Sequence, residues 1–292
     1  YLAMVGYRSA GATTQFGMNL SAVNNRFFVP GPLSLADFEN SPENANATYL
    51  TRREHRHNRI GKISAMLNHQ FSEATELSAN AFIGTKFLQR SERNTFRDFN
   101  RYNVGGSVNA HTSFDLGDVA KNTFLAGFDE SYQDGAILFY YLTPGAGRGD
   151  LKTDKREGAN TFGLFAQNEI VLWQGDVVEK GENKTDKSFS LILGGRYDVV
   201  TYYNEVYFDG GENKRMSEDK SYKHFTPKVG LTYRFAKNAS VYCNMGGGVE
   251  VPAGNETDPV STFSDDTVHL VNSLLEPIVS TTFEFGNKGR LD

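Results

Sequence analysis

Arginine and tyrosine residues recur in the polar stretches of this sequence, where their side chains could bind a bulky anion. An arginine guanidinium pairs with carboxylate oxygens through two parallel hydrogen bonds. An aromatic ring packs on the apolar part of a ligand. This chemistry is binding without covalent change, although each residue could also be an ordinary solvated or interfacial side chain. The candidate ligand-binding residues are Tyr49, Arg52, Arg53, His55, Arg101, Tyr102, Tyr140, Tyr141, Arg148, Tyr203 and Tyr207.

Other chemistry has little support in the sequence. His55 and His57 are spaced so that both imidazoles could share one face of a strand, but such a pair is more often solvated at the base of a loop, so no metal site is predicted. The glycine-rich stretch GAGRGD at 145–150 resembles a phosphate loop, yet no helical pattern follows to supply an amide-lined N-terminus. The sequence has no HExxH motif and no discernible Ser/His/Asp order. We therefore expect neither an enzyme nor a resident cofactor.

The composition narrows the class of protein further. A net charge of −5 argues against a nucleic-acid partner, and a single cysteine, Cys243, rules out a disulfide framework. The longest apolar run, AILFYYL at 136–142, is too short for a membrane-spanning helix. A mean hydropathy of −0.47 looks soluble, yet transmembrane barrels are also polar because half of every strand faces inward. Tyr1 falls inside what looks like a strand, so we expect the chain to be part of a longer protein.

The elements that must position the candidate residues are β-strands. Apolar and polar side chains alternate between residues 225 and 252 in two runs joined by a tight turn. Because successive side chains of a strand leave opposite faces, this period of two predicts an antiparallel hairpin. Leu231 and Val241 fall on its apolar face, and Thr232 and Ser240 fall on its polar face.

The same alternation predicts roughly eleven strands, and the connections between them have two lengths. In an antiparallel meander alternate connections lie at the same end, so the short turns gather at one end and the long polar loops at the other. Outer-membrane barrels have this asymmetry. The predicted short turns are 10–13, 72–75, 117–121 and 236–238. The predicted long loops are 27–53, 90–101, 142–158, 204–222 and 253–275. The turn at 175–187 departs from this alternation of short and long connections, because it is longer than the other turns at its end.

Two soluble architectures compete with the barrel. A repeat of about fifty residues could indicate a kelch-type propeller, but each blade needs four short strands, whereas each period here supplies two long ones. A β-sandwich would turn its polar faces outward and would have to explain why the long loops share one end. We therefore predict an all-β fold, an antiparallel up-and-down transmembrane β-barrel in which charged strand residues such as Arg196 and Asp198 face an enclosed interior.

Five stretches, taken in order, carry a family resemblance. They are VPGPLSLADFENSPENANATYL (29–50), LILGGRYD (191–198), HFTPKVGLTYRF (224–235), NASVYCNMGGGVEVP (238–252) and LLEPIVSTTFEFGNKG (274–289). Together they resemble the barrel of TonB-dependent outer-membrane receptors of the iron-siderophore type. The resemblance spans nearly the whole chain, so residues 1–292 are expected to form one partial barrel domain.

The resemblance implies about half of a 22-stranded barrel, without the plug domain and without the segment that engages the energy-coupling protein TonB. It implies an outer-membrane receptor for a ferric siderophore or a ferric citrate-like chelate, with lipid and TonB as partners. Such ligands are commonly anionic, which suits the arginine and tyrosine candidates. A receptor for another nutrient, such as a cobalamin or a carbohydrate, remains an alternative. So does a soluble secreted β-rich module for binding or adhesion.

Overall fold

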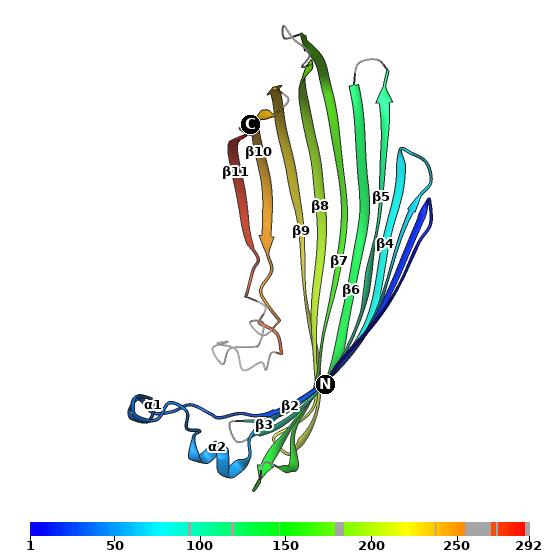
Figure 1. The fold of residues 1–292 in the computed structure, drawn as a ribbon. Helices are drawn as coiled ribbons and strands as arrows, with labels where there is room; N and C mark the ends of the chain where they lie inside the picture. Colours follow the sequence, from blue (N-terminus) through cyan, green and yellow to red (C-terminus); the bar gives the residue numbers. More distant parts are fainter. Residues whose placement is uncertain are drawn as a thin grey trace.

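The computed structural model shows the chain as one open, curved β-sheet (Figure 1). The structure describes residues 1–289 except 93–94, 118–119, 146, 179–183, 237, 255–269 and 273. Within these residues, eleven antiparallel strands pair in sequence order. The strands are β1 Leu2–Ala10, β2 Thr14–Phe28, β3 His55–Gln70, β4 Thr75–Glu92, β5 Thr95–Leu116, β6 Ala120–Thr143, β7 Gly147–Val178, β8 Lys184–Asp209, β9 Glu212–Ala236, β10 Ala239–Glu250 and β11 Ile278–Gly289.

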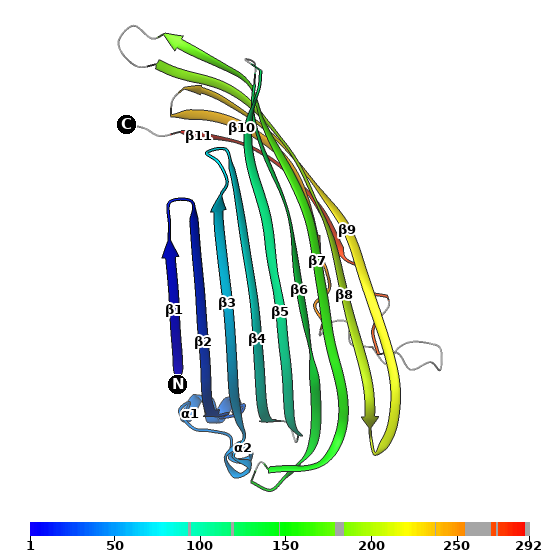
Figure 2. The same ribbon diagram turned by 90° about the vertical axis from the view of Figure 1, so that its right-hand side faces the viewer.

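The up-and-down order confirms the predicted topology, and the sheet has two distinct ends (Figure 2). The β1–β2 and β3–β4 turns lie at one end, here called the turn end. The other end, here called the helix end, carries two short helices, α1 Leu35–Asn40 and α2 Ala47–Arg52, between β2 and β3. No helix in the described ranges is long and apolar enough to cross a membrane.

Most of the predicted long loops are strand instead. Residues assigned to loops at 90–101, 142–158 and 204–222 extend β4 to β9, which turn within a few residues at the helix end. These predictions were wrong because alternation of apolar and polar residues disappears where both faces of a hairpin are in water, since neither face then needs to be apolar. The loop predicted at 27–53 contains both helices, each capped by a side chain: Ser34 accepts from the Asp37 amide, and Asn46 accepts from the Thr48 and Tyr49 amides. Most of the loop predicted at 253–275 and the centre of the turn predicted at 175–187 lie outside the described residues.

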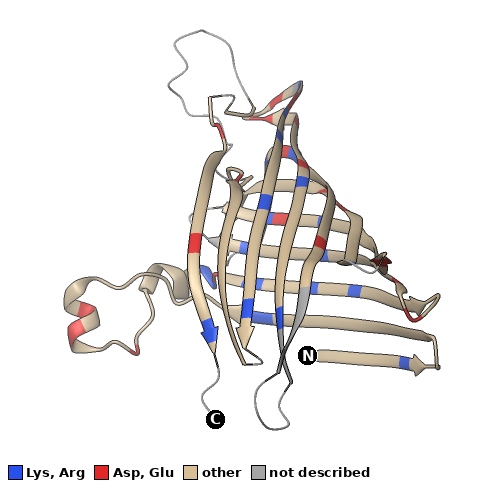
Figure 3. Cartoon of the chain, turned by 90° about the horizontal axis from the view of Figure 1, so that it is seen from above, with Lys and Arg blue, Asp and Glu red and all other residues tan. Residues whose placement is uncertain are grey.

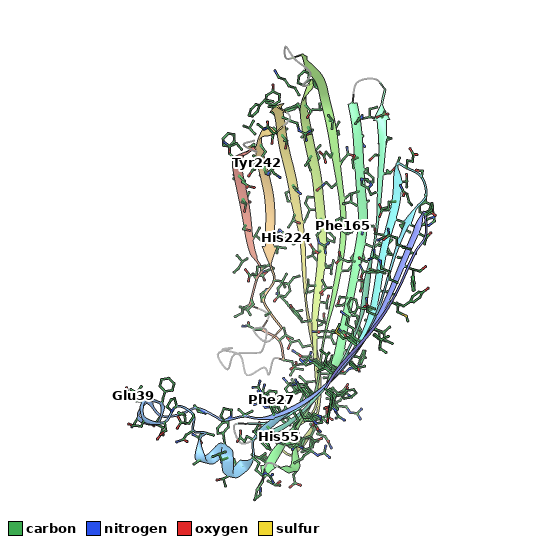
Figure 4. The ribbon with its side chains drawn as sticks, viewed as in Figure 1. Phe27, Glu39, His55, Phe165, His224 and Tyr242 are labelled. Carbon is green, nitrogen blue, oxygen red and sulfur yellow. The ribbon has the colours of Figure 1, made fainter. Side chains whose placement is uncertain are left out.

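The two faces of the sheet differ as the alternation predicted. Leu20, Ile63, Ile83 and Val104 lie directly opposite one another across β2 to β5, and each is about half exposed. The face that carries them is called the outer face. The opposite, inner face carries polar groups such as Asn80, which lies opposite Ser107 on β5. Side chains stand out from both faces of this one layer (Figure 4).

A soluble sandwich would cover its apolar face, and this sheet does not. Leu231 is 40% exposed and lies in register with Cys243 of β10, and no second sheet packs on it in the part of the chain that the structure describes. The fold is therefore a single-layered barrel wall, and the sandwich and the propeller are both excluded as its architecture.

The inner face is the hollow side of the sheet, whose arc is visible from above (Figure 3). A pocket of about 430 Å³ opens on it, lined by inner-face residues of β6 to β11 such as Gln167, Lys228 and Asn244. Nearby, Arg196 of β8 reaches over β7 to donate two hydrogen bonds to Asp129 of β6, at 2.7 and 2.9 Å. Arg196 also bonds Asp198, so the predicted placement of these two charges on the interior side is confirmed.

Candidate ligand-binding surface

The inner face at the helix end carries a concentration of positive charge. Arg56 of β3 lies directly opposite Arg90 of β4, which lies directly opposite Arg97 of β5. The same face carries Lys62, Lys86 and Arg101 closer to the middle of the sheet. The basic surface, as it is called below, consists of Arg56, Lys62, Lys86, Arg90, Arg97 and Arg101.

Aromatic rings hold several of these cations against the wall. The Arg97 guanidinium lies 4.8 Å from the centre of the Phe139 ring, and that of Arg90 lies 5.9 Å from the centre of Phe99. Like charges directly opposite one another across strands repel. The row therefore concentrates positive charge on the inner face, which suits a ligand that carries negative charge.

Between the arginine row and the middle of the sheet, a smaller hollow of about 250 Å³ is lined by Lys62, Lys86, Arg101, Asn103 and Gln133, among others. Its floor is Gly84, where a Cβ atom would come within 2.5 Å of the Asn103 side-chain oxygen. Arg101 pairs with Glu157 of β7 at 2.7 Å. Within the described residues, Lys62 and Lys86 contact no carboxylate, so their ammonium groups are available to an anionic group of a ligand.

The structure brings only part of the predicted ligand-binding set to the inner face. Arg101 and Tyr141 face inward, and Tyr49, Arg52 and Arg53 belong to α2 and its C-terminal cap. The other six lie on the outer face, as their register and contacts place them: His55, Tyr102, Tyr140, Arg148, Tyr203 and Tyr207.

Several outer-face residues form a cluster of their own. The Asp134 carboxylate of β6 accepts hydrogen bonds from Arg156 of β7 and from the Tyr102 hydroxyl of β5, the latter at 2.6 Å. Tyr132 also donates to it at 3.2 Å, and the Tyr203 ring of β8 stacks on the Tyr132 ring. The cluster thereby joins four strands, on the helix-end side of the apolar band that Leu20, Ile63, Ile83 and Val104 form on the outer face. This structural role was not evident from the sequence.

The structure accounts for the two motifs that suggested other chemistry, the His55/His57 pair and the glycine-rich stretch at 145–150. His55 Nδ1 lies 3.1 Å from the Arg53 carbonyl oxygen, and His57 Nε2 lies 2.8 Å from the Asn24 side-chain oxygen. No group of three or more His, Cys, Asp and Glu side chains is arranged to hold a metal among the residues that the structure covers. Of the glycine-rich stretch, residues 147–150 begin strand β7, and residue 146 lies outside the described residues.

The basic surface itself was missed at the level of individual residues. The alternation did place Lys62 and Lys86 on the polar side of their strands. Residues 90–101 were predicted to form a loop, so Arg90 and Arg97 were not assigned to either face of a strand. Nothing in the sequence indicated that they align with Arg56. The available signal was the spacing of two between Lys86, Leu88 and Arg90, which keeps Arg90 on the face of Lys86.

An uninterrupted up-and-down sheet with one lipid-facing apolar side and one charged concave side defines a β-barrel wall of the bacterial outer membrane. The family model for the TonB dependent receptor-like β-barrel matches residues 3–292. The chain therefore belongs to the TonB-dependent receptor β-barrel family. Barrels of this membrane have short periplasmic turns and larger extracellular connections. The helix end carries the long connection between β2 and β3 and the extended hairpins of β6 to β9, so it faces out of the cell.

Solved structures show the same fold. The chain is similar to the unliganded ferric citrate transporter FecA, with a TM-score of 0.74 and 15% identity over 99% of this chain and 40% of that one. It is also similar to the closed form of the ferric-catecholate import receptor Fiu from E. coli K12, with a TM-score of 0.65 and 13% identity over 99% of this chain and 48% of that one. The chain thus spans less than half the length of these structures. A comparison with curated protein sequences found no match.

Proposed function

We propose that this chain is part of the barrel of a receptor that binds a ferric chelate, either a ferric siderophore or a ferric citrate-like complex, for uptake energised by TonB. The observation that carries the proposal is the basic surface, which lies on the inner face toward the outside of the cell. The family membership and the ferric-chelate receptors among the similar structures support it.

In this proposal the chain captures its ligand electrostatically. Arginine guanidiniums donate paired hydrogen bonds to carboxylate or catecholate oxygens. The cations act in a partly enclosed space where charges are less screened than in bulk water. Lys62, Lys86 and Arg101 would hold one anionic group in the hollow above Gly84, and the row of Arg56, Arg90 and Arg97 would hold others. Tyr141 and the residues of α2 remain candidates for packing on the ligand from above.

The proposal is tested first by growth. Cells that lack the gene for the intact receptor are supplied with ferric citrate or one ferric siderophore as the sole source of iron. We expect growth to fail on at least one of them and to return when the gene is restored. Unchanged uptake on every ferric source would contradict the proposal and would favour another nutrient, such as a cobalamin or a carbohydrate.

The contribution of the basic surface is tested by binding of radiolabelled ferric citrate to cells that carry the intact receptor. The double variant R90Q/R97Q removes two charges from the arginine row. The control R8Q/R234Q removes two charges from the inner face at the turn end. The first variant is expected to bind about tenfold more weakly, and the control is expected to bind like wild type. Equal binding by the two variants would remove the arginine row from the proposed site.

A further inference from the structure

A second group of cations lies on the opposite side of the wall, where the ligand cannot reach it from the interior. Arg26 of β2 lies directly opposite His57 of β3, and Arg59 follows two residues along β3 on the same face. Their parity is that of Leu20 and Ile63, so all three side chains belong to the outer face. These three residues are called the outer basic patch.

The patch begins where the lipid-facing apolar band ends. Along β2 toward the helix end, the outer face runs from the exposed apolar residues Met18 and Leu20 through Ala22 to Asn24 and then Arg26. Arg26, His57 and Arg59 therefore lie at the level where hydrocarbon gives way to polar headgroups on the extracellular side.

One arginine of the patch is held in place by a neighbouring ring. The Arg59 guanidinium lies 5.6 Å from the centre of the Phe87 ring on β4, and Phe87 is 39% exposed at the edge of the apolar band. A guanidinium stacked on an aromatic face keeps its in-plane N–H groups available to a second partner. The geometry thus presents donors along the surface of the wall, toward the headgroup layer.

Other arginines of the same face are neutralised, whereas these two are not. Arg156 pairs with Asp134, and Arg148 pairs with Asp98 at 3.1 Å. In the described part of the chain, neither Arg26 nor Arg59 contacts a carboxylate. The nearest outer-face acid in register is Asp98, which lies two strands from His57, or about 10 Å away, and is already engaged with Arg148.

The groups that surround the patch are uncharged and can bond an oxyanion or its neighbours. Asn24 lies opposite Arg59 and bonds His57, and Gln89 of β4 lies opposite His57. The site therefore combines two unneutralised guanidiniums, two amides and one imidazole beside a hydrocarbon surface. Phosphate is the anionic group that membrane lipids offer at this depth.

We propose that the outer basic patch binds the phosphate groups of a phosphorylated lipid of the outer leaflet and so fixes one lipid molecule against β2 to β4. The acyl chains of that lipid would lie on Leu20, Ile63 and Ile83, below the patch on the same face. This site is separate from the interior, so it does not depend on the identity of the transported ligand.

The test uses the intact receptor purified in an uncharged detergent, with native mass spectrometry to count bound lipid. The probes are lipid A with two phosphates and the same lipid after removal of its phosphates. The variant R26Q/R59Q is compared with R8Q/R234Q, which changes the net charge equally on the inner face. R26K/R59K keeps the charge and checks that loss of binding does not reflect a damaged sheet.

We expect wild type, R8Q/R234Q and, largely, R26K/R59K to retain the phosphorylated lipid in preference to the dephosphorylated one. R26Q/R59Q should bind it on the order of tenfold more weakly, because two cations near a lipid phosphate are lost. Equal retention by R26Q/R59Q and wild type would overturn the proposal, as would a wild type that binds both lipids alike. Displacement of the lipid by millimolar inorganic phosphate would also overturn it, because the site would then hold a free anion.

Discussion

Arg156 and Asp134 form a two-pronged ion pair between β7 and β6 on the outer face of the wall. The Arg156 Nε atom donates to both Asp134 oxygens, at 2.8 and 3.0 Å, and the Asp134 side chain has no exposed surface. The Tyr102 and Tyr132 hydroxyls donate further hydrogen bonds to the Asp134 carboxylate. This pair stands above the apolar band, so it joins the strands where lipid no longer confines them.

Asp134→Ala is expected to destabilise the extracellular hairpins, because it leaves the Arg156 guanidinium and the Tyr102 hydroxyl without their shared acceptor. The cost should be about 2 kcal/mol, a typical value for hydrogen bonds to a charged group. Limited proteolysis of intact cells measures it, with cleavage expected between β6 and β7. Asp219→Ala, which removes an acid on the outer face of β9, two strands from β7, is the control. Cleavage at the same rate in both variants would show that the pair does not hold the hairpins.

Leu231→Arg and Val241→Arg place a charge on the outer face, where the side chain meets hydrocarbon. Each is expected to cost about 2 to 4 kcal/mol if it lies near the bilayer midplane. Thr232→Arg and Ser240→Arg place the same charge on the inner face of the same strands and should be far milder. Denaturant unfolding in lipid vesicles measures all four variants. Equal costs on the two faces would contradict the assignment of faces.

Gly163→Ala is expected to destabilise the barrel wall by about 1 kcal/mol, although glycine in a strand is usually less favourable than alanine. The reason is that a Cβ atom at Gly163 would overlap the Arg196 guanidinium, which is fixed by Asp129 and Asp198. At Gly61 the nearest atom to a new Cβ is the Thr85 hydroxyl oxygen at 3.6 Å, an ordinary contact. Gly61→Ala should therefore be neutral or slightly stabilising in the same unfolding assay, and matching effects at both sites would argue against this explanation.

Binding of ferric citrate by the intact receptor is expected to weaken as salt is raised, because part of the attraction between the basic surface and the ligand is screened by ions. In R90Q/R97Q both the affinity and its dependence on salt should fall, with about a tenfold loss of affinity for one charge-assisted contact. Titrations at several sodium chloride concentrations measure both quantities. A salt dependence that is the same in R90Q/R97Q and wild type would mean that other charges attract the ligand.

The sequence predicts the fold well because the relevant signal is local. Alternation alone placed Leu231 and Val241 on one face and Thr232 and Ser240 on the other, and the register confirms both. The loops at the helix end were mispredicted because the alternation of apolar and polar residues disappears where both faces of a hairpin are exposed to water. Strand ends above the membrane are fixed by pairing with neighbours, which a single sequence does not encode residue by residue.

The candidate site was harder to predict from the sequence than the fold was, for the same reason. Residue types indicated an anion-binding surface, but adjacent residues of a strand point to opposite sides, so an error in strand limits moves a side chain to the wrong face. Arg101 and Tyr102 illustrate this, since one pairs with Glu157 on the inner face and the other with Asp134 on the outer face. The alignment of Arg56, Arg90 and Arg97 depends on the register of three strands, which only the structure supplies.

The great length of the strands determines which part of the protein a macromolecule approaching the cell contacts first. β7 comprises 32 residues, which at about 3.3 Å each span roughly 100 Å, whereas a barrel strand needs only about 9 to 11 residues to cross the hydrocarbon. The β6–β7 and β8–β9 hairpins therefore extend well beyond the bilayer, and an antibody or a phage tail would contact them before it reached the lipid.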